Sequence, residues 1–296
     1  MSLPRQVLPG QFYMITRRCT QRQFLLRPDP ETNNAFTYCL IEAAQRYQIS
    51  VLLTCAMSNH HHTVIFDEQG RYPEFVEHFH KMLARSQNVL RRRWENFWSS
   101  EQVSVVKLTG REDVINKLVY TATNPVKDHL VERVHHWPGV NGLGDLLSGR
   151  ELRAVRPRHF FRRDGSMPEA VVMALSIPAE LGPAAELREE LRQRVRAVEE
   201  EVAAERRRTG KRICGRRAVL EQSWEGKPSS IEPRGGLKPR VAARNQWARM
   251  EALLRNREFI DAYTKAREGW RNGEVVAFPP GTYWLRRFAY VSIAET

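Results

Sequence analysis

The sequence of 296 residues contains only four cysteines, Cys19, Cys39, Cys55 and Cys214, and no two of them form a CxxC pair. Cysteines so far apart argue against a disulfide framework or a zinc knuckle and indicate reduced thiols. No apolar run approaches the roughly 20 residues needed to cross a bilayer, and residues 1–10 lack the apolar centre of a signal peptide. We therefore expect a cytoplasmic protein with no membrane partner.

Acidic residues are in short supply, with 34 Asp and Glu against 47 Lys and Arg, which gives a net charge of +13. The sequence pI is about 10.0. The hydrophobic content of 42% is ordinary, so the chain is globular, and its length allows two domains that each bury a core. A positive surplus of this size favours a polyanionic partner, and nucleic acid in particular.

Three consecutive histidines, His60, His61 and His62, lie just before the apolar run 63–66, which is rich in β-branched residues. This pattern predicts a strand, paired with another strand over residues 51–57. Because side chains alternate along a strand, His60 and His62 share one face and His61 points to the other. Two imidazoles on one face can reach a single divalent ion if a further residue completes the site. The alternative is a packed or solvated histidine cluster.

Periodicity and capping signals predict the remaining elements of the first half of the chain. They place strands at 11–18 and 103–108, and helices at 30–47, 72–97 and 112–123. The helix at 30–47 opens with Asp29 as its N-cap and Pro30 at its first position. This order is a ferredoxin-like βαββαβ arrangement with an added helix, so we predict an α+β fold.

The last of these helices leads into the motif Tyr120-Thr-Ala-Thr-Asn124-Pro-Val-Lys127. Tyr120 and Asn124 are four residues apart and share one face of the helix. An amide oxygen can bind a hard cation, and a phenol can attack a phosphodiester to form a covalent phosphotyrosine. The alternatives are that Tyr120 only packs in the core and that Asn124 ends the helix before Pro125.

Basic residues next to aromatic residues suit single-stranded nucleic acid, because guanidinium groups bind phosphates and flat rings stack on bases. Arg17 and Arg18 end the first strand, and Arg91, Arg92 and Arg93 precede Trp94. The alternative for each arginine is a solvated position. The pair His78 and His80 lies on a predicted helix, where residues two apart diverge, so we expect these two histidines to be at the surface or in packing.

The composition changes after residue 137. Residues 139–144 are rich in glycine and predict a turn-rich linker in preference to a phosphate-binding loop. An amphipathic helix follows over 187–202. Residues 205–245 contain 12 Lys and Arg but 4 Asp and Glu, which indicates either a DNA-binding arm or a solvated linker. We therefore divide the chain into a catalytic domain, 1–150, and a basic, mainly helical accessory region, 151–296.

Together, NHHHTVI on a strand and YxxxNPVK on a helix resemble the REP-associated tyrosine transposases, which are single-tyrosine members of the HUH single-strand DNA transposases. The resemblance covers roughly residues 8–138. It implies a nuclease domain that uses Mg²⁺ or Mn²⁺ on single-stranded or hairpin DNA. It also implies that His60, His62 and Asn124 are metal ligands, that Tyr120 is the nucleophile and that Lys127 contacts DNA.

Two features depart from this family. His61 stands where a bulky apolar residue is usual, and residues 95–100 lack a Gly-His-Trp-Gln-Gly-like run. The expected activity is metal-dependent cleavage and rejoining of single-stranded DNA through a phosphotyrosine, as in a transposase. The alternatives are a replication-initiator or relaxase-like nicking enzyme, and an idle regulator that only binds hairpin DNA. The sequence leaves open whether the protein is a monomer or a homodimer.

Overall fold

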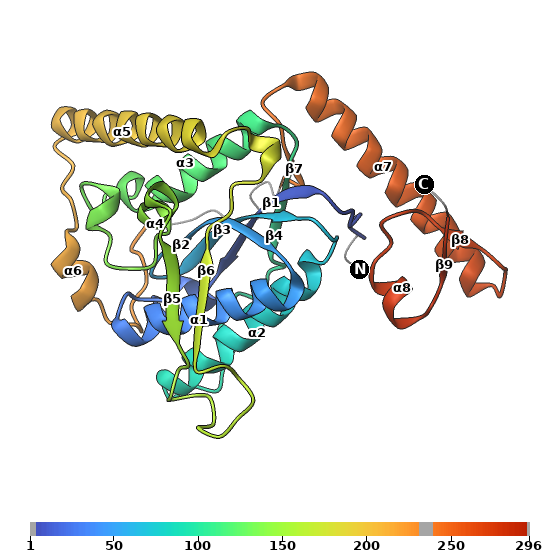
Figure 1. The fold of residues 1–296 in the computed structure, drawn as a ribbon, viewed down its shortest axis with the longest axis horizontal. Coiled ribbons are helices and arrows are strands. Elements are labelled where there is room, and N and C mark those ends of the chain that lie inside the picture. Colours follow the sequence, from blue (N-terminus) through green and yellow to red (C-terminus); the bar gives the residue numbers. More distant parts are fainter. Residues whose placement is uncertain (1–3, 231–238, 295–296) are drawn as a thin grey trace.

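The computed structural model describes residues 4–230 and 239–294, and its centre is a five-stranded sheet (Figure 1). The strands are β1 (Gln11–Arg18), β2 (Ser50–Ala56), β3 (His60–Asp67), β4 (Ser104–Leu108) and β7 (Val241–Ala242). They lie in the order β2-β3-β1-β4-β7. The first four are antiparallel, and β7 pairs in parallel with β4. The predicted α+β class and ferredoxin-like order are therefore confirmed.

Helices cover both faces of this sheet. On one face, α1 (Pro30–Tyr47) and α2 (Tyr72–Leu90) pack against each other, with Phe36 and Phe79 fully buried between them and the sheet. On the other face lies α3 (Arg111–Lys127), which contacts β2 and β3. As predicted, Asp29 caps α1, and its carboxylate accepts a hydrogen bond from the Thr32 amide at 2.7 Å. The two faces therefore have separate sets of side chains.

Helix α2 ends at Leu90, earlier than the predicted end at residue 97. Arg92 has a left-handed backbone, with φ of 53°, and the chain turns there. The cause is tertiary, because Phe97 and Trp98 are buried at the rim of the sheet. The Trp98 indole donates to the His80 carbonyl at 2.9 Å, a contact that a continuing helix would prevent.

Helix α3 differs in the opposite direction, because it continues through Asn124 and Pro125 to Lys127. An internal proline removes one helical hydrogen bond. Here the loss is offset by burial, since Val126 is fully buried and Pro125 is also buried. The prediction that Pro125 ends the helix at residue 123 is therefore wrong, and Asn124 lies within the helix.

The glycine-rich segment 139–144 is not a free linker. The Ala56 amide donates to the Val140 carbonyl at 2.8 Å, and the Gly142 amide donates to the Thr54 carbonyl at 2.9 Å. The segment thus runs along the edge of β2 and leads into α4 (Leu143–Ser148). It therefore extends the sheet at β2, the strand that pairs with the histidine strand β3.

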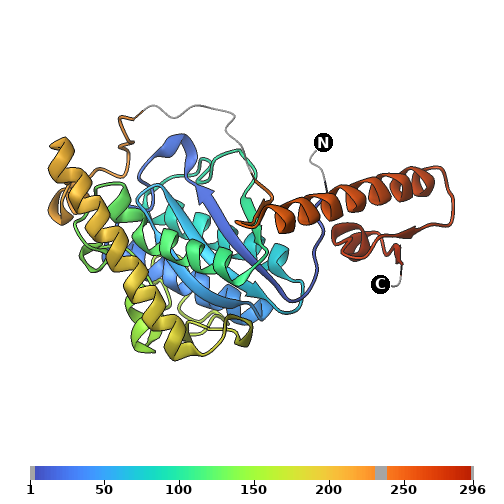
Figure 2. The ribbon, with the colours of Figure 1, turned by 90° about the horizontal axis from the view of Figure 1, so that it is seen from above.

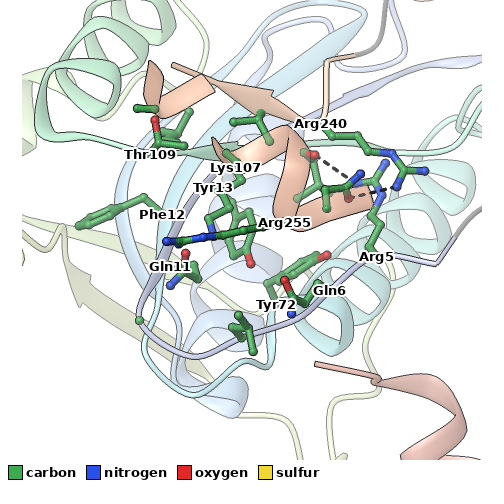
Figure 3. A pocket seen from close by; sticks show the side chains of 18 of the residues that line it. Arg5, Gln6, Gln11, Phe12, Tyr13, Tyr72, Lys107, Thr109, Arg240 and Arg255 are labelled. Carbon is green, nitrogen blue, oxygen red and sulfur yellow. Dashed lines mark hydrogen bonds between the residues drawn. The ribbon is translucent and has the colours of Figure 1, made fainter. Parts of the chain in front are cut away.

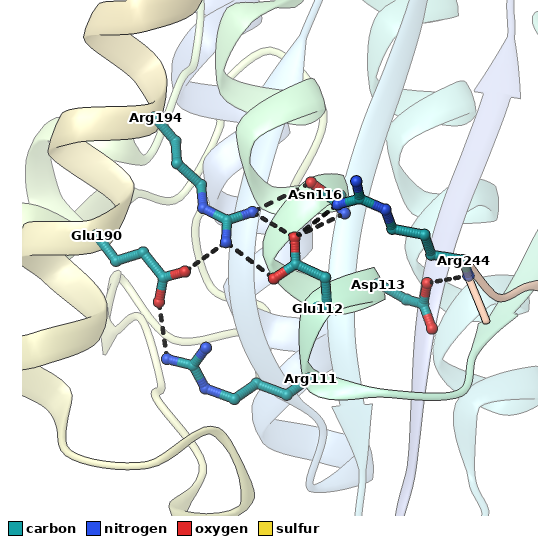
Figure 4. A network of polar contacts seen from close by, with 7 residues as sticks. All are labelled: Arg111, Glu112, Asp113, Asn116, Glu190, Arg194 and Arg244. Atoms are coloured by element: carbon teal, nitrogen blue, oxygen red, sulfur yellow. Dashed lines mark hydrogen bonds and ion pairs between the residues drawn. The ribbon is translucent and has the colours of Figure 1, made fainter.

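The region after residue 150 is built onto this domain. Strands β5 (Glu151–Val155) and β6 (Ala170–Ala174) form a second sheet that packs on α1. Helix α5 (Ala184–Thr209) packs on α3 and buries Leu187, Leu191 and Val195. Polar contacts fasten the same helices together (Figure 4): Arg194 of α5 binds Glu112 at 2.7 and 2.8 Å.

The C-terminal part projects from the β4 side of the sheet (Figures 1 and 2). It consists of α7 (Gln246–Arg271), α8 (Trp284–Phe288) and the short strands β8 (Ala277–Phe278) and β9 (Ser292–Ile293). The Val7 amide donates to the Gly281 carbonyl at 3.0 Å, which ties this part to the N-terminal segment. Residues 231–238 of the predicted basic arm lie outside the described residues.

None of the helices that the structure describes is both long enough and apolar enough to span a bilayer.

Candidate active site

Strand β3 presents its three histidines to opposite faces of the sheet. The rings of His60 and His62 lie on the α3 face, with their centroids 4.8 Å apart. His61 points into the α1–α2 layer, where its ring contacts Phe36 and Phe79. This is the alternation that a regular strand imposes. Two imidazoles therefore share one surface, and the third is excluded from it.

Helix α3 brings Tyr120 and Asn124 to the same surface. The Tyr120 and His62 ring centroids are 5.2 Å apart. The Asn124 amide nitrogen lies 3.4 Å from His62 Nε2. The four residues that the sequence selected, two from β3 and two from α3, therefore lie together.

Hydrogen bonds fix the orientation of both imidazoles. The Asn59 side-chain nitrogen donates to the Arg22 carbonyl at 3.3 Å, which leaves the Asn59 oxygen facing His60 Nδ1 at 2.6 Å. His60 must therefore donate through Nδ1 and keep the lone pair on Nε2. His62 Nδ1 lies 2.7 Å from the Thr16 hydroxyl. Such outer contacts on one ring nitrogen are the usual support for metal binding by the other.

The Asn124 side-chain oxygen is buried and has no hydrogen-bond partner within the described residues. A buried, unpaired acceptor is costly unless a donor or a cation reaches it. The residues present thus fit a divalent cation bound by two imidazole nitrogens and one amide oxygen. No group of three or more His, Cys, Asp or Glu among the described residues could hold a metal, so such a site depends on the amide.

Burial, and then the nearby charge of Arg18, lower the pKa of His60, and burial also lowers the pKa of His62. Both rings are therefore neutral near pH 7, with lone pairs available. Burial raises the pKa of the Tyr120 phenol, and the Asp128 carboxylate raises it further. The phenol is accordingly protonated in the resting site.

These side chains line a cavity of about 890 Å³ with a basic rim. The Lys127 ammonium lies 5.6 Å from the centroid of the Tyr120 ring, and the Lys117 ammonium lies 5.4 Å from it. Arg18 also lines the cavity. Of the cationic residues selected from the sequence, Arg18 and Lys127 thus accompany the four central side chains.

The other selected arginines are not among the residues that line this cavity. Arg17 points to the opposite face, where it reaches His80 Nδ1 at 3.1 Å. Arg91 is buried in an ion pair with Asp29 at 2.9 Å. Arg93 stacks on Trp224, and Arg92 is exposed beyond the end of α2. These four arginines, for which nucleic-acid binding remains a prediction, lie outside the cavity because α2 ends early and side chains alternate along β1.

Several residues that line this cavity were not selected from the sequence. They come from the segment between β1 and α1 and from residues 211–230, which pass across the cavity: Arg22, Phe24, Lys211, Gln222 and Lys227. The crossing segment is held in place, since the Phe24 amide donates to the Gly226 carbonyl at 2.9 Å. No local sequence signal joins segments this far apart, apart from the general excess of basic residues after residue 205.

Comparison with known proteins finds likenesses to solved transposase structures. One is the structure of a REP-associated tyrosine transposase bound to a REP hairpin, with 16% identity and a TM-score of 0.40, covering 56% of this chain and 91% of that chain. Another is a proposed transposase from Deinococcus radiodurans, with 17% identity and a TM-score of 0.28, covering 36% of this chain and 85% of that chain. No protein-family model and no curated protein matches.

At these identities the likeness concerns the fold alone. The α+β architecture itself rests on the elements and the strand order described above. What the protein does has to be inferred from the site.

Proposed function

We propose that the protein cleaves and rejoins single-stranded DNA through a covalent bond to Tyr120, with Mg²⁺ or Mn²⁺ held by His60, His62 and Asn124, in transposase-type chemistry. The observation that carries this proposal is the convergence of these four side chains in one cavity with a basic rim. A metallonuclease that uses water would not require a phenol at this position, and a core tyrosine would not lie beside two oriented imidazoles.

The reaction follows from the groups present. The Tyr120 oxygen attacks the phosphorus of the scissile phosphodiester and loses its proton, a phosphotyrosine bond forms, and the bond to one deoxyribose oxygen breaks. That oxygen takes up a proton and leaves as a hydroxyl. Attack by a deoxyribose hydroxyl on the phosphotyrosine reverses these steps and rejoins a strand. When bound, the cation would polarise and orient the phosphate.

The site must stabilise phenolate character, because the phenol pKa is raised. The ammonium groups of Lys117 and Lys127 lie 5.4 and 5.6 Å from the centroid of the Tyr120 ring, and positive charge near the phenol would favour its ionised form during the reaction. Lys127 also lies at the cavity rim and can contact a phosphate. Hairpin DNA belongs to the proposal because it offers an unpaired strand for the cavity and a duplex whose phosphates suit a basic surface.

A covalent adduct tests the proposal. The full chain is incubated with end-labelled single-stranded and hairpin DNA in Mn²⁺ or Mg²⁺ and separated under denaturing conditions. We expect a labelled protein band for the wild type and none for Tyr120→Phe, which removes the attacking oxygen but keeps the ring. DNA affinity should stay nearly unchanged. Cleavage by Tyr120→Phe would contradict the assignment of the nucleophile, and binding without cleavage by the wild type would favour an idle DNA-binding protein.

A further inference from the structure

A second cavity, of about 430 Å³, lies between the sheet and α7. Its floor includes Tyr13 of β1 and Lys107 of β4, which are cross-strand partners. Tyr13 is three residues from Thr16 along β1, roughly 10 Å, and alternation points the two side chains to opposite faces. Thr16 faces the candidate metal site, so this cavity is separate from it.

Four cations line this cavity, and Figure 3 shows how they lie: Arg5, Lys107, Arg240 and Arg255. Arg5 and Arg240 lie close together at one side, and Arg255 lies apart from them. The cations come from the N-terminal segment, β4, the residue before β7, and α7. Four segments far apart in the sequence thus place positive charge around one hollow.

These charges are poorly neutralised. Glu251 is the one carboxylate among the described residues of the lining, and it pairs with Arg255 at 2.5 Å along the surface of α7. Arg5 donates to the neutral Val105 carbonyl at 3.1 Å, and Arg240 donates to the neutral Asn256 side-chain oxygen at 3.4 Å. The Lys107 ammonium has no hydrogen-bond or ion-pair partner in the part of the chain that the structure describes.

Burial, and then repulsion from a neighbouring cation, lowers the pKa of two of these cations. Burial and the charge of Arg255 lower the pKa of Lys107. Burial and the charge of Arg5 lower the pKa of Arg240. Four cations that share a single carboxylate destabilise one another, and a bound anion would relieve this cost.

We propose that this cavity binds a backbone phosphate of DNA, with Lys107 as the central contact and Arg5, Arg240 and Arg255 around it. The assignment rests on the proposed function for the identity of the polymer. Guanidinium and ammonium groups suit phosphate oxygens. The Arg255 side chain is 69% exposed, so the rim is open to a polymer. A DNA held at Tyr120 would pass around the β4–β7 edge to reach it.

The test measures DNA affinity against salt concentration for the full chain carrying Lys107→Gln, with labelled hairpin DNA that has single-stranded flanks. Glutamine keeps much of the side-chain length but removes the charge. We expect several-fold weaker binding at about 0.1 M salt and a log–log slope smaller by about 0.7 to 0.9. Arg255→Gln is the second variant and should act in the same direction.

Arg257→Gln is the matched control. Arg257 is two residues from Arg255 on α7, its side chain is 82% exposed, and it does not line the cavity. We expect it to leave the salt slope unchanged. Thermal melting gives an independent readout without DNA: Lys107→Gln should melt no lower than the wild type, because it removes an unpaired, repelled ammonium.

An unchanged salt slope for both Lys107→Gln and Arg255→Gln would overturn the proposal. Thermal melting in inorganic phosphate, without DNA, tells whether the cavity binds a free phosphate ion instead of a DNA phosphate. If inorganic phosphate raises the melting temperature of the wild type but not of Lys107→Gln, while DNA binding is unaffected, the cavity holds a small anion and the DNA assignment is wrong. Failure of the Tyr120 adduct together with a reduced slope would remove the proposed chemistry and leave this phosphate site standing.

Discussion

The Nε2 atoms of His61 and His80 lie 2.8 Å apart, and both imidazoles are buried. One ring must donate to the other across this distance. Arg17 can only donate, and its Nη1 lies 3.1 Å from His80 Nδ1, so His80 accepts there and donates through Nε2. His61 therefore accepts through Nε2 and donates through Nδ1 to the Thr63 hydroxyl at 3.1 Å.

The chain of hydrogen bonds continues to the backbone of the strand that carries the candidate ligands. The Thr63 and Thr54 hydroxyls are 2.9 Å apart, and Thr54 donates to the backbone carbonyl of His62 at 3.2 Å. Every bond from Arg17 to that carbonyl then runs in one direction, with both histidines neutral. His61, which the family pattern would replace by an apolar residue, is thus part of the support of the strand that carries the candidate ligands.

We expect His61→Leu to lower the free energy of unfolding at pH 7 by about 1–3 kcal/mol, because it leaves the His80 Nε2 donor without a partner in the core and removes one of the two hydrogen bonds of the Thr63 hydroxyl. Urea unfolding of the full chain measures the change. His135→Leu is the control, since His135 is exposed and its replacement should stay within about 0.5 kcal/mol of the wild type. Equal stability of His61→Leu and wild type would show that this buried chain of hydrogen bonds does not stabilise the fold.

Stability should also fall in acid. Burial, followed by the neighbouring His60 and Arg17, lowers the pKa of His61 from 6.5 to about 3. Between pH 3 and pH 6.5, His61 binds a proton in the unfolded chain but stays neutral in the folded chain. The contribution of His61 to the free energy of unfolding is therefore at its maximum above about pH 6.5. It decreases as the pH falls toward 3, by up to about 1.4 kcal/mol per pH unit. Unfolding curves at pH 7, 6 and 5 measure the slope, which should be shallower in His61→Leu.

The sequence was sufficient for the side chains whose placement follows from local geometry. Strand alternation separated His61 from His60 and His62, and helical spacing joined Tyr120 to Asn124. It was not sufficient for Thr16 or Asn59, although both are close to predicted features. Their contacts to the histidines depend on the register of β1 against β3 and on the turn before β3, and neither is encoded in a short pattern.

The positions of the arginines could not be predicted from a short sequence pattern either. Arg91 and Arg93 looked like a cationic helix end, but the burial of Phe97 and Trp98 ends α2 before them. Arg91 then pairs with Asp29, which joins the end of α2 to the start of α1. Tertiary packing thus overrode a continuous helical pattern. The residues that cross the cavity from 211–230 depend on a path of the chain that no periodicity predicts.

Thr16→Val should weaken binding of Mn²⁺ about tenfold with little effect on stability. Valine has nearly the shape of threonine but cannot accept a hydrogen bond from His62 Nδ1, so the ring loses the contact that orients it. Isothermal titration of the full chain with Mn²⁺ measures the affinity. Thr264→Val, remote on α7, is the control and should bind as the wild type does. If Thr16→Val binds Mn²⁺ unchanged, His62 is either not a ligand or is oriented by something else.

Helix α5 should be required for a stable domain, although it follows residue 150. Leu191 is fully buried, on a helix that packs against α3, the helix that carries Tyr120 and Asn124. We expect Leu191→Ala to lower the free energy of unfolding by about 2–5 kcal/mol through lost burial and a cavity. Leu254→Ala on α7 is the matched control, because that side chain is 56% exposed and should cost less than about 0.5 kcal/mol.

Truncation near Arg156 removes α5. It should therefore expose the face of α3 that α5 covers and give a protein that unfolds or aggregates. A truncated chain that melts cooperatively at the wild-type temperature would show that residues 1–156 fold independently and that α5 only rests on them.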